Sequence, residues 1–106
     1  MRLNDCKFIG RLVEQPEVRE TSSGMKVCGF NIAVNNFDSE KDALFVKVKT
    51  FRNTADFVGS YLEKGSPVFV SGQLNINRYE DQNSGQTRYF TEILAREVQS
   101  LQSRAN

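Results

Sequence analysis

The sequence lacks several of the residues on which metal sites and acid–base catalysis usually depend. It contains no histidine, so the commonest metal ligand and general base is missing. Its two cysteines, Cys6 and Cys28, form no CxxC motif, and we expect neither a disulfide scaffold nor a zinc site. Both lie among apolar neighbours and are interpreted as small core residues in a reducing cytoplasm. We therefore expect no metal, no cofactor and no enzymatic activity.

The sequence also lacks long apolar runs and an excess of charge of either sign. No stretch is long enough to span a bilayer and the N-terminus has no signal-peptide pattern, so we expect no membrane association. Lys and Arg number 14 and Asp and Glu 13, and the resulting net charge of +1 indicates no particular partner. A surface for a polyanion must therefore come from local sorting of charge. The 106 residues suit one domain with a single core.

Such local sorting is found in residues 44–52. At the two-residue period of a β-strand, this run separates into an apolar face and a face of aromatic and basic residues. The apolar face holds Leu44, Val46, Val48 and Thr50, and the other face holds Phe45, Lys47, Lys49 and Phe51. Aromatic rings that bracket two lysines suit single-stranded nucleic acid, which offers both phosphates and flat bases. The same face could instead be an ordinary exposed strand on which lysines prevent edge-to-edge aggregation.

Alternating patterns predict four further strands, at residues 3–13, 26–36, 67–79 and 87–101. For the first three of these, the expected inward side chains are Cys6, Phe8, Gly10 and Leu12; Cys28, Phe30, Ile32 and Val34; and Val68, Val70, Leu74 and Ile76. Gly72 in mid-strand indicates a bulge or a sharp bend. The outward residues of 26–36 are mostly small or amide-bearing, which leaves room either for a ligand or for another strand.

The segments between the strands carry turn and helix signals. Residues 18–25 are predicted to form a flexible loop or a short hairpin turn, residues 36–43 a charged loop, and residues 81–85 a hairpin turn. After residue 52 the apolar spacing becomes helical, with Asn53 as the expected N-cap and Gly65 as the C′ residue. The helical apolar positions are Phe57, Val58, Tyr61 and Leu62. We expect this short helix to plug one end of a barrel.

The order of these elements predicts an all-β fold of the OB class. Three strands, one helix and two strands match the five-stranded Greek-key barrel of the OB-fold, with one short helix between strands 3 and 4. We assign residues 1–101 to this domain and residues 102–106 to a short C-terminal remnant without an acidic tail. In the OB-fold the second and third strands form the oligonucleotide-binding surface. The aromatic and lysine face of residues 44–52 lies on the third strand.

Three blocks of the sequence also resemble bacterial single-stranded DNA-binding proteins. The blocks are Phe8-Ile9-Gly10-Arg11-Leu12 with Gln15-Pro16-Glu17-Val18-Arg19; Tyr61 to Val68 with Ser71-Gly72-Gln73-Leu74; and Tyr79 to Gln82 with Gly85-Gln86 and Arg88 to Glu92. The resemblance covers roughly residues 6–101 and implies a protein that coats single-stranded DNA in replication, repair and recombination. It also implies a homotetramer, or a dimer, in the bacterial cytoplasm at the nucleoid or replication fork, of chromosomal, phage or plasmid origin.

The resemblance also assigns contact residues. The base-stacking positions of the family fall on Phe37, Phe45, Phe51 and Tyr79, and its phosphate-contacting positions fall on Arg19, Lys47 and Arg78. Lys49 is added from its place on the same strand face. The chain departs from the family by having no tryptophan and by ending without the usual acidic tail. We therefore do not expect tail-dependent replication partners for this form.

Two other classes of function remain open at this stage. The first is an OB-fold replication-accessory protein of primosomal type, or a protein-interaction module, in which the aromatic residues would lie in a subunit interface. The second is a nuclease, since Asp38, Glu40 and Asp42 form the densest cluster of carboxylates. Because the chain has neither histidine nor metal-ligand spacing, we interpret this cluster as part of a solvated loop.

Overall fold

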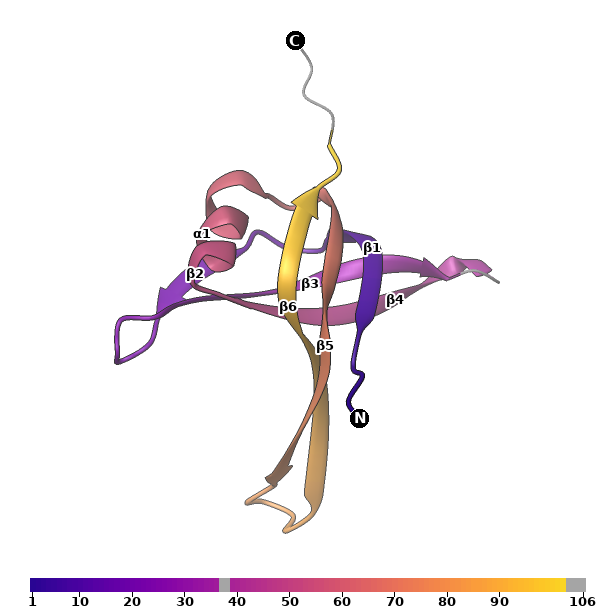
Figure 1. Cartoon of the computed structure of the whole chain (residues 1–106). Coiled ribbons are helices and arrows are strands. Elements are labelled where there is room, and N and C mark those ends of the chain that lie inside the picture. The colour runs from indigo at the N-terminus through magenta and orange to yellow at the C-terminus, as the bar shows by residue number, and fades with distance from the viewer. Residues whose placement is uncertain (37–38, 103–106) are drawn as a thin grey trace.

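The computed structural model describes residues 1–36 and 39–102, which form six strands and one helix (Figure 1). In chain order these are β1 (Cys6–Leu12), β2 (Glu17–Glu20), β3 (Lys26–Asn36), β4 (Ser39–Phe51), α1 (Arg52–Tyr61), β5 (Pro67–Glu80) and β6 (Thr87–Ser100). The helix is too short to span a membrane, and no other helix lies in the described ranges.

Five of the strands pair into a closed ring. β1 pairs antiparallel with β5 along most of its length and with β3 at Arg11 and Leu12. β5 continues to β6, β6 meets β4 in a short parallel pairing at Val48 and Lys49, and β4 returns to β3. β2 lies outside the ring, beside β3. The fold is therefore all-β with one short helix between β4 and β5, as the sequence predicted, and is consistent with an OB-fold.

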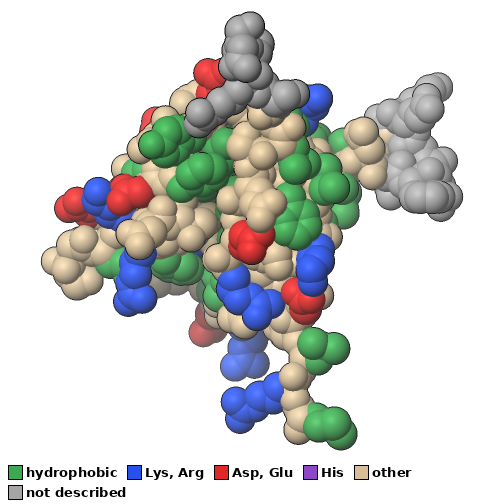
Figure 2. Space-filling model, turned by 45° about the horizontal axis from the view of Figure 1, so that its top comes forward, with side chains coloured by type: hydrophobic (Ala, Val, Ile, Leu, Met, Phe, Trp, Pro, Cys, Tyr) green, Lys and Arg blue, Asp and Glu red, His purple; other side chains and the backbone are tan. Residues whose placement is uncertain are grey.

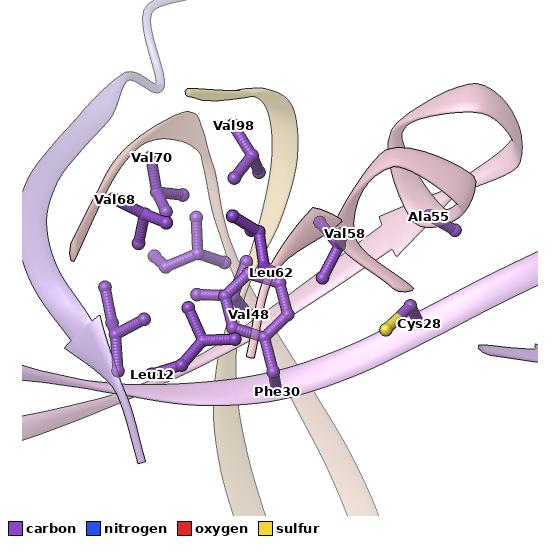
Figure 3. Packing of buried hydrophobic residues seen from close by; sticks show 12 residues of the cluster. Leu12, Cys28, Phe30, Val48, Ala55, Val58, Leu62, Val68, Val70 and Val98 are labelled. Atoms are coloured by element: carbon purple, nitrogen blue, oxygen red, sulfur yellow. The ribbon is translucent and has the colours of Figure 1, made fainter. Parts of the chain in front are cut away.

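The core fills the ring and is covered at one end by α1. Figure 3 shows Phe30, Val48 and Leu62 pointing toward one another, with Val58 reaching them from the helix. Phe30 is 1% exposed and Val48 and Val58 are fully buried. The inward faces predicted around these residues are confirmed for Leu12, Cys28, Phe30, Ile32, Val48, Thr50, Val58, Leu62, Val68 and Val70. Burial raises the pKa of the Cys28 thiol, which keeps it protonated in the core.

Four apolar residues that were expected to face inward are exposed instead. Leu44, Leu74 and Ile76 are 50%, 40% and 57% exposed, and Tyr61 on the helix is 71% exposed. The reason for the strand residues is that β3–β4 and β5–β6 continue past the ring as two-stranded ribbons (Figure 1). Their side chains keep the alternation of the core, but no other element of the described chain covers that side. Tyr61 ends the last helical turn and leans on Phe57 rather than on the core.

The boundaries of the helix differ from those predicted. The chain turns straight from the extended Phe51, which is the N-cap and has no side-chain cap bond, into a helix that begins at Arg52 rather than after Asn53. The helix ends at Tyr61 because Leu62 returns to an extended conformation that puts its side chain in the core, 3% exposed. Gly65 is therefore not the C′ residue. It lies in the following turn with a φ of 89°.

Two segments predicted as loops contain strand. Residues 17–20 form β2, which pairs with Lys26 to Gly29 across the Thr21–Met25 turn, so the hairpin alternative for residues 18–25 was the better one. β4 begins at Ser39 rather than at residue 44, so much of the expected loop 36–43 belongs to the β3–β4 ribbon. Within this segment Ala43 pairs with Asn35 and Ser39 pairs with Asn36, with a register shift between the two pairs.

Gly72 lies at a bulge between β5 and β6, as predicted. Ser71 is paired with Glu97 but Gly72 is paired with Ala95, so β6 carries one extra residue at this point. The backbones approach closely there, since a Cβ atom at Gly72 would lie 2.2 Å from the carbonyl oxygen of Leu94. The bulge separates the part of β5 that closes the ring from the part that forms the ribbon.

We expect Gly72→Ala to destabilise the protein, because the added methyl group collides with backbone atoms that cannot move aside. Overpacking of this kind costs about 1–3 kcal/mol or more. The measurement is urea unfolding, with a lower midpoint and an unchanged m-value. Gly29→Ala is the matched control, because the nearest atom to a Cβ there is 3.8 Å away. Equal midpoints for the two variants would contradict the close approach at Gly72.

Candidate nucleic-acid interface

The outer face of the β3–β4 pair is a row of large side chains on one strand beside small ones on the other. The register places Phe45 opposite Ala33, Lys47 opposite Asn31, Lys49 opposite Gly29 and Phe51 opposite Val27. Because the β3 side chains are short, the rings and lysines of β4 stand above an open floor. No further strand packs on this floor in the described chain, which favours the ligand alternative over close packing.

This floor belongs to a groove of about 680 Å³. One wall comes from the segment that leads into and includes β2, and the other comes from the base of the β5–β6 ribbon. The lining residues are Glu14, Gln15, Glu17, Arg19, Val27, Gly29, Phe30, Asn31, Lys47, Lys49, Asn77, Phe90 and Glu92. Both lysines of the predicted site and Arg19 are thus brought together in one concave surface.

The opposite face of β4 holds the site in place. Val48 and Thr50 are fully buried, and the Thr50 hydroxyl donates a 2.8 Å hydrogen bond to the carbonyl oxygen of Cys28. A strand anchored this way must present its alternate residues outward. Phe45 is 66% exposed and Lys47 is exposed, whereas Lys49 and Phe51 are half-buried.

Each lysine of the row lies over an aromatic ring. Lys49 Nζ is 5.6 Å from the centre of the Phe51 ring, and Lys47 Nζ is 5.5 Å from the centre of the Phe90 ring on β6. Phe90 also contacts Tyr79 on β5, with ring centres 6.2 Å apart. The aromatic and lysine row therefore continues from β4 onto the ribbon.

Phe90 is a site residue that the sequence analysis missed. It is 40% exposed and lines the groove. The available signal was the alternation that puts Phe90 on the same side of the last strand as Arg88 and Glu92. No inward and outward sides were predicted for that strand. Its neighbour across the ribbon is Asn77, two residues before Tyr79 on the same face. Phe90 adjoins Lys47 because β6 pairs with β4 at Val48 and Lys49, a contact between segments that are far apart in the sequence.

The remaining predicted residues are placed less uniformly. Tyr79 is 49% exposed and adjoins the groove through Phe90. Arg78 is exposed but lies across from Tyr89, on the face of the ribbon that points away from Tyr79 and the groove. Phe37 lies outside the described residues. Figure 2 shows basic side chains beside hydrophobic ones on the projecting part of the molecule, which in Figure 1 is the β5–β6 hairpin.

Two of the three carboxylates that line the groove, Glu14 and Glu92, accept hydrogen bonds from asparagines. Asn31 donates a 2.8 Å hydrogen bond to Glu14, and Asn75 and Asn77 donate 3.3 and 3.1 Å bonds to the buried Glu92. Among the side chains of residues 1–35 and 42–102, neither Lys47 nor Lys49 has an ion-pair partner. Arg19 has only a long contact of 3.8 Å with Glu17. The positive charge of the two lysines is therefore available to a ligand.

The tip of the β5–β6 hairpin is ordered by Asp81. The backbone N–H of Asn83 and the Arg88 guanidinium, which lies 2.9 Å from the carboxylate, lower the pKa of Asp81. The turn is closed by bonds from Asp81 N–H to the Gln86 carbonyl and from Gly85 N–H to the Asp81 carbonyl. This confirms the predicted turn at residues 81–85 and holds Tyr79 on a regular strand.

The arrangement can stack flat rings and neutralise phosphates. In the described ranges, no group of three or more His, Cys, Asp or Glu residues could hold a metal ion. Of the acidic cluster considered above, Asp38 lies outside the described residues, and Glu40 and Asp42 are part of β4.

Comparison with known proteins gives one family. A model of the single-strand binding protein family matches residues 3–101. The chain is 39% identical over 104 residues to Single-stranded DNA-binding protein 1 of Staphylococcus aureus (strain Mu50 / ATCC 700699), covering 94% of this chain and 66% of that protein. It is 38% identical over 108 residues to Single-stranded DNA-binding protein 3 of Listeria innocua, covering 98% of this chain and 67% of the relative. The chain thus spans about two thirds of these relatives.

Proposed function

Because the chain belongs to the single-strand binding protein family, we propose that it binds single-stranded DNA in the groove over β3 and β4, with little regard to base sequence. The observation that carries this proposal is that Lys47, Lys49 and Arg19 line one concave surface and that aromatic rings lie in it or directly beside it. Phe90 lines the groove, whereas Phe51, Tyr79 and Phe45 adjoin it: Phe51 lies under Lys49, Tyr79 contacts Phe90, and Phe45 shares the outer face of β4 with the lysines.

Binding combines two contributions that any base can use. Each base stacked on an aromatic side chain contributes about 1–3 kcal/mol, and every base has a flat face. Lysines beside the rings neutralise phosphates and release counterions. A duplex hides the faces of its bases, so this surface discriminates strandedness. The same contacts would serve single-stranded RNA, and the 2′-hydroxyl is the group that could separate the two polymers.

The amide side chains of the groove support sequence-independent binding. Asn31, Asn75 and Asn77 are of the type that reads base edges. Their amide groups are used instead to hold Glu14 and Glu92. Each of these bonds uses an amide N–H and fixes the orientation of the side chain, which disfavours the bidentate contact by which asparagine reads a base edge. The protein acts in this account by binding alone, without a chemical step.

In the cell we place this function in the cytoplasm, in the coating of single strands during replication, repair and recombination. The assembly proposed is a homotetramer, or a dimer. Its support in this chain is apolar exposure away from the groove, at Ile9 on β1 and at Leu74 and Ile76 on the ribbon. Because none of these residues lines the groove, subunits can associate without covering it. This separates the proposal from an interaction module whose aromatic residues lie in the interface.

Light scattering of the full chain tests the assembly. We expect a mass of four protomers, or of two, and the same number of protomers when oligothymidine is bound. Phe45→Ala should leave this mass unchanged, since Phe45 lies on the outer face of β4 beside the groove and away from Ile9, Leu74 and Ile76. A smaller assembly for that variant would favour the interaction module, with the ring in a subunit interface.

Affinity for oligothymidine should fall steeply with salt. The expected log–log slope is roughly −0.7 for each phosphate neutralised on a single strand. Lys47→Ala should weaken binding and make the slope shallower by about 0.7, with little effect on folding because the side chain is exposed. Fluorescence titration of a labelled strand at several salt concentrations measures both. A duplex of the same length is the control, and equal affinity for duplex and single strand would contradict the proposal.

Stacking is tested by removing single rings. Phe45→Ala and Phe90→Ala should each weaken binding by about 1–3 kcal/mol without changing the salt slope. Because Phe45 is 66% exposed, its removal should change the free energy of unfolding by no more than about 0.5 kcal/mol. Phe30→Ala, one strand away in the core, should cost about 3–5 kcal/mol of stability. Unchanged affinity in both groove variants would remove stacking from the account.

A further inference from the structure

One residue of the described chain adopts a backbone conformation that its side chain does not favour. Arg52 has a φ of 56°, whereas the other described residues with positive φ are Gly24, Gly65 and Gly85. Glycine adopts this conformation without steric cost, but an L-residue with a Cβ atom is strained in it. The backbone gains nothing from an arginine here. An arginine at this position is therefore better explained by a contact that its guanidinium makes.

Arg52 directly follows the end of the aromatic and lysine row. The preceding residue is Phe51, whose ring lies under Lys49 at the rim of the groove. Arg52 itself is exposed and lines a second hollow of about 480 Å³, formed by the β2–β3 turn and the start of α1. The other lining residues are Ser23, Gly24, Met25, Lys26, Asn53 and Asp56. A single strand of DNA that left the groove past Phe51 would reach this hollow next, because Arg52 lines it.

Of the two basic side chains that line the hollow, Lys26 is paired with a carboxylate and Arg52 is not. Lys26 is bound to Asp56 at 3.0 Å, and this hydrogen-bonded carboxylate raises the pKa of Lys26. The Arg52 side chain has no hydrogen bond or ion pair to any side chain of residues 1–35 and 42–102. The single carboxylate that lines the hollow is thus already engaged. An anion entering it would meet the guanidinium without a competing partner.

We propose that Arg52 is a phosphate-binding residue that extends the DNA path from Phe51 into the hollow between the β2–β3 turn and α1. The inference rests on the proposed function of the groove. A guanidinium binds a phosphate through two parallel N–H donors and keeps its charge at all relevant pH values. The contact adds to affinity but reads no base, in keeping with binding that tolerates any sequence.

The decisive variant is Arg52→Gly, because affinity and stability should respond differently. Removing the guanidinium should weaken binding of a long oligothymidine about threefold to tenfold at fixed salt. The log–log salt slope should become shallower by about 0.7. The thermal midpoint should not fall, since glycine adopts a φ of 56° without strain. Titration of a labelled strand and thermal unfolding of the full chain supply the two readouts.

Arg52→Lys is the matched control, since it keeps both the charge and the backbone strain. It should retain the salt slope of the parent, with an affinity closer to the parent than to Arg52→Gly. If the parent binds but Arg52→Gly binds equally with the same slope, Arg52 makes no phosphate contact and the inference fails while the groove stands. A lower thermal midpoint for Arg52→Gly would overturn it by showing a structural role. A parent that binds no single strand would overturn the proposed function itself.

Discussion

The pairing of β3 with β4 is the constraint on which the candidate site depends. Its inner face carries Phe30 and Val48, which are almost completely buried, and the Thr50 hydroxyl ties the two strands together at Cys28. A slip of one residue in this register would turn every inner side chain outward. The core therefore fixes which side chains face the groove. The rings and lysines of β4 lie on its outer face because their neighbours in the sequence are held in the core.

The sequence was sufficient for the parts of the structure that depend on one strand at a time. Alternation along residues 44–52 separated Val48 and Thr50 from Phe45 and Lys47, and the burial of the first pair agrees with it. The bulge at Gly72 was also found from the chain alone, since a glycine inside a strand pattern has few other uses. These features are local, so a pattern of period two can carry them.

What the sequence could not show depends on partners that are distant along the chain. Phe90 belongs to the site because β6 lies beside both β5 and β4, a relation that no local pattern encodes. The prediction that Leu74 and Ile76 face inward was wrong for a related reason. Alternation states which side of a strand a residue occupies, but not whether another element covers that side. Past the end of the ring, the same pattern produces an exposed face.

The contacts of Lys47 and Lys49 in the free protein explain how a chain with a net charge of only +1 can present a surface for a polyanion. A carboxylate beside Lys47 or Lys49 would fix the side chain but would also cancel its charge. The rings of Phe90 and Phe51 hold the same lysines at 5.5 and 5.6 Å by a contact of about 0.5–1 kcal/mol at an exposed site, and leave the charge uncancelled. The nearby glutamates are occupied by asparagines. A net charge of +1 is therefore no obstacle, because Glu14 and Glu92 are bound by asparagines while Lys47 and Lys49 are held by aromatic rings.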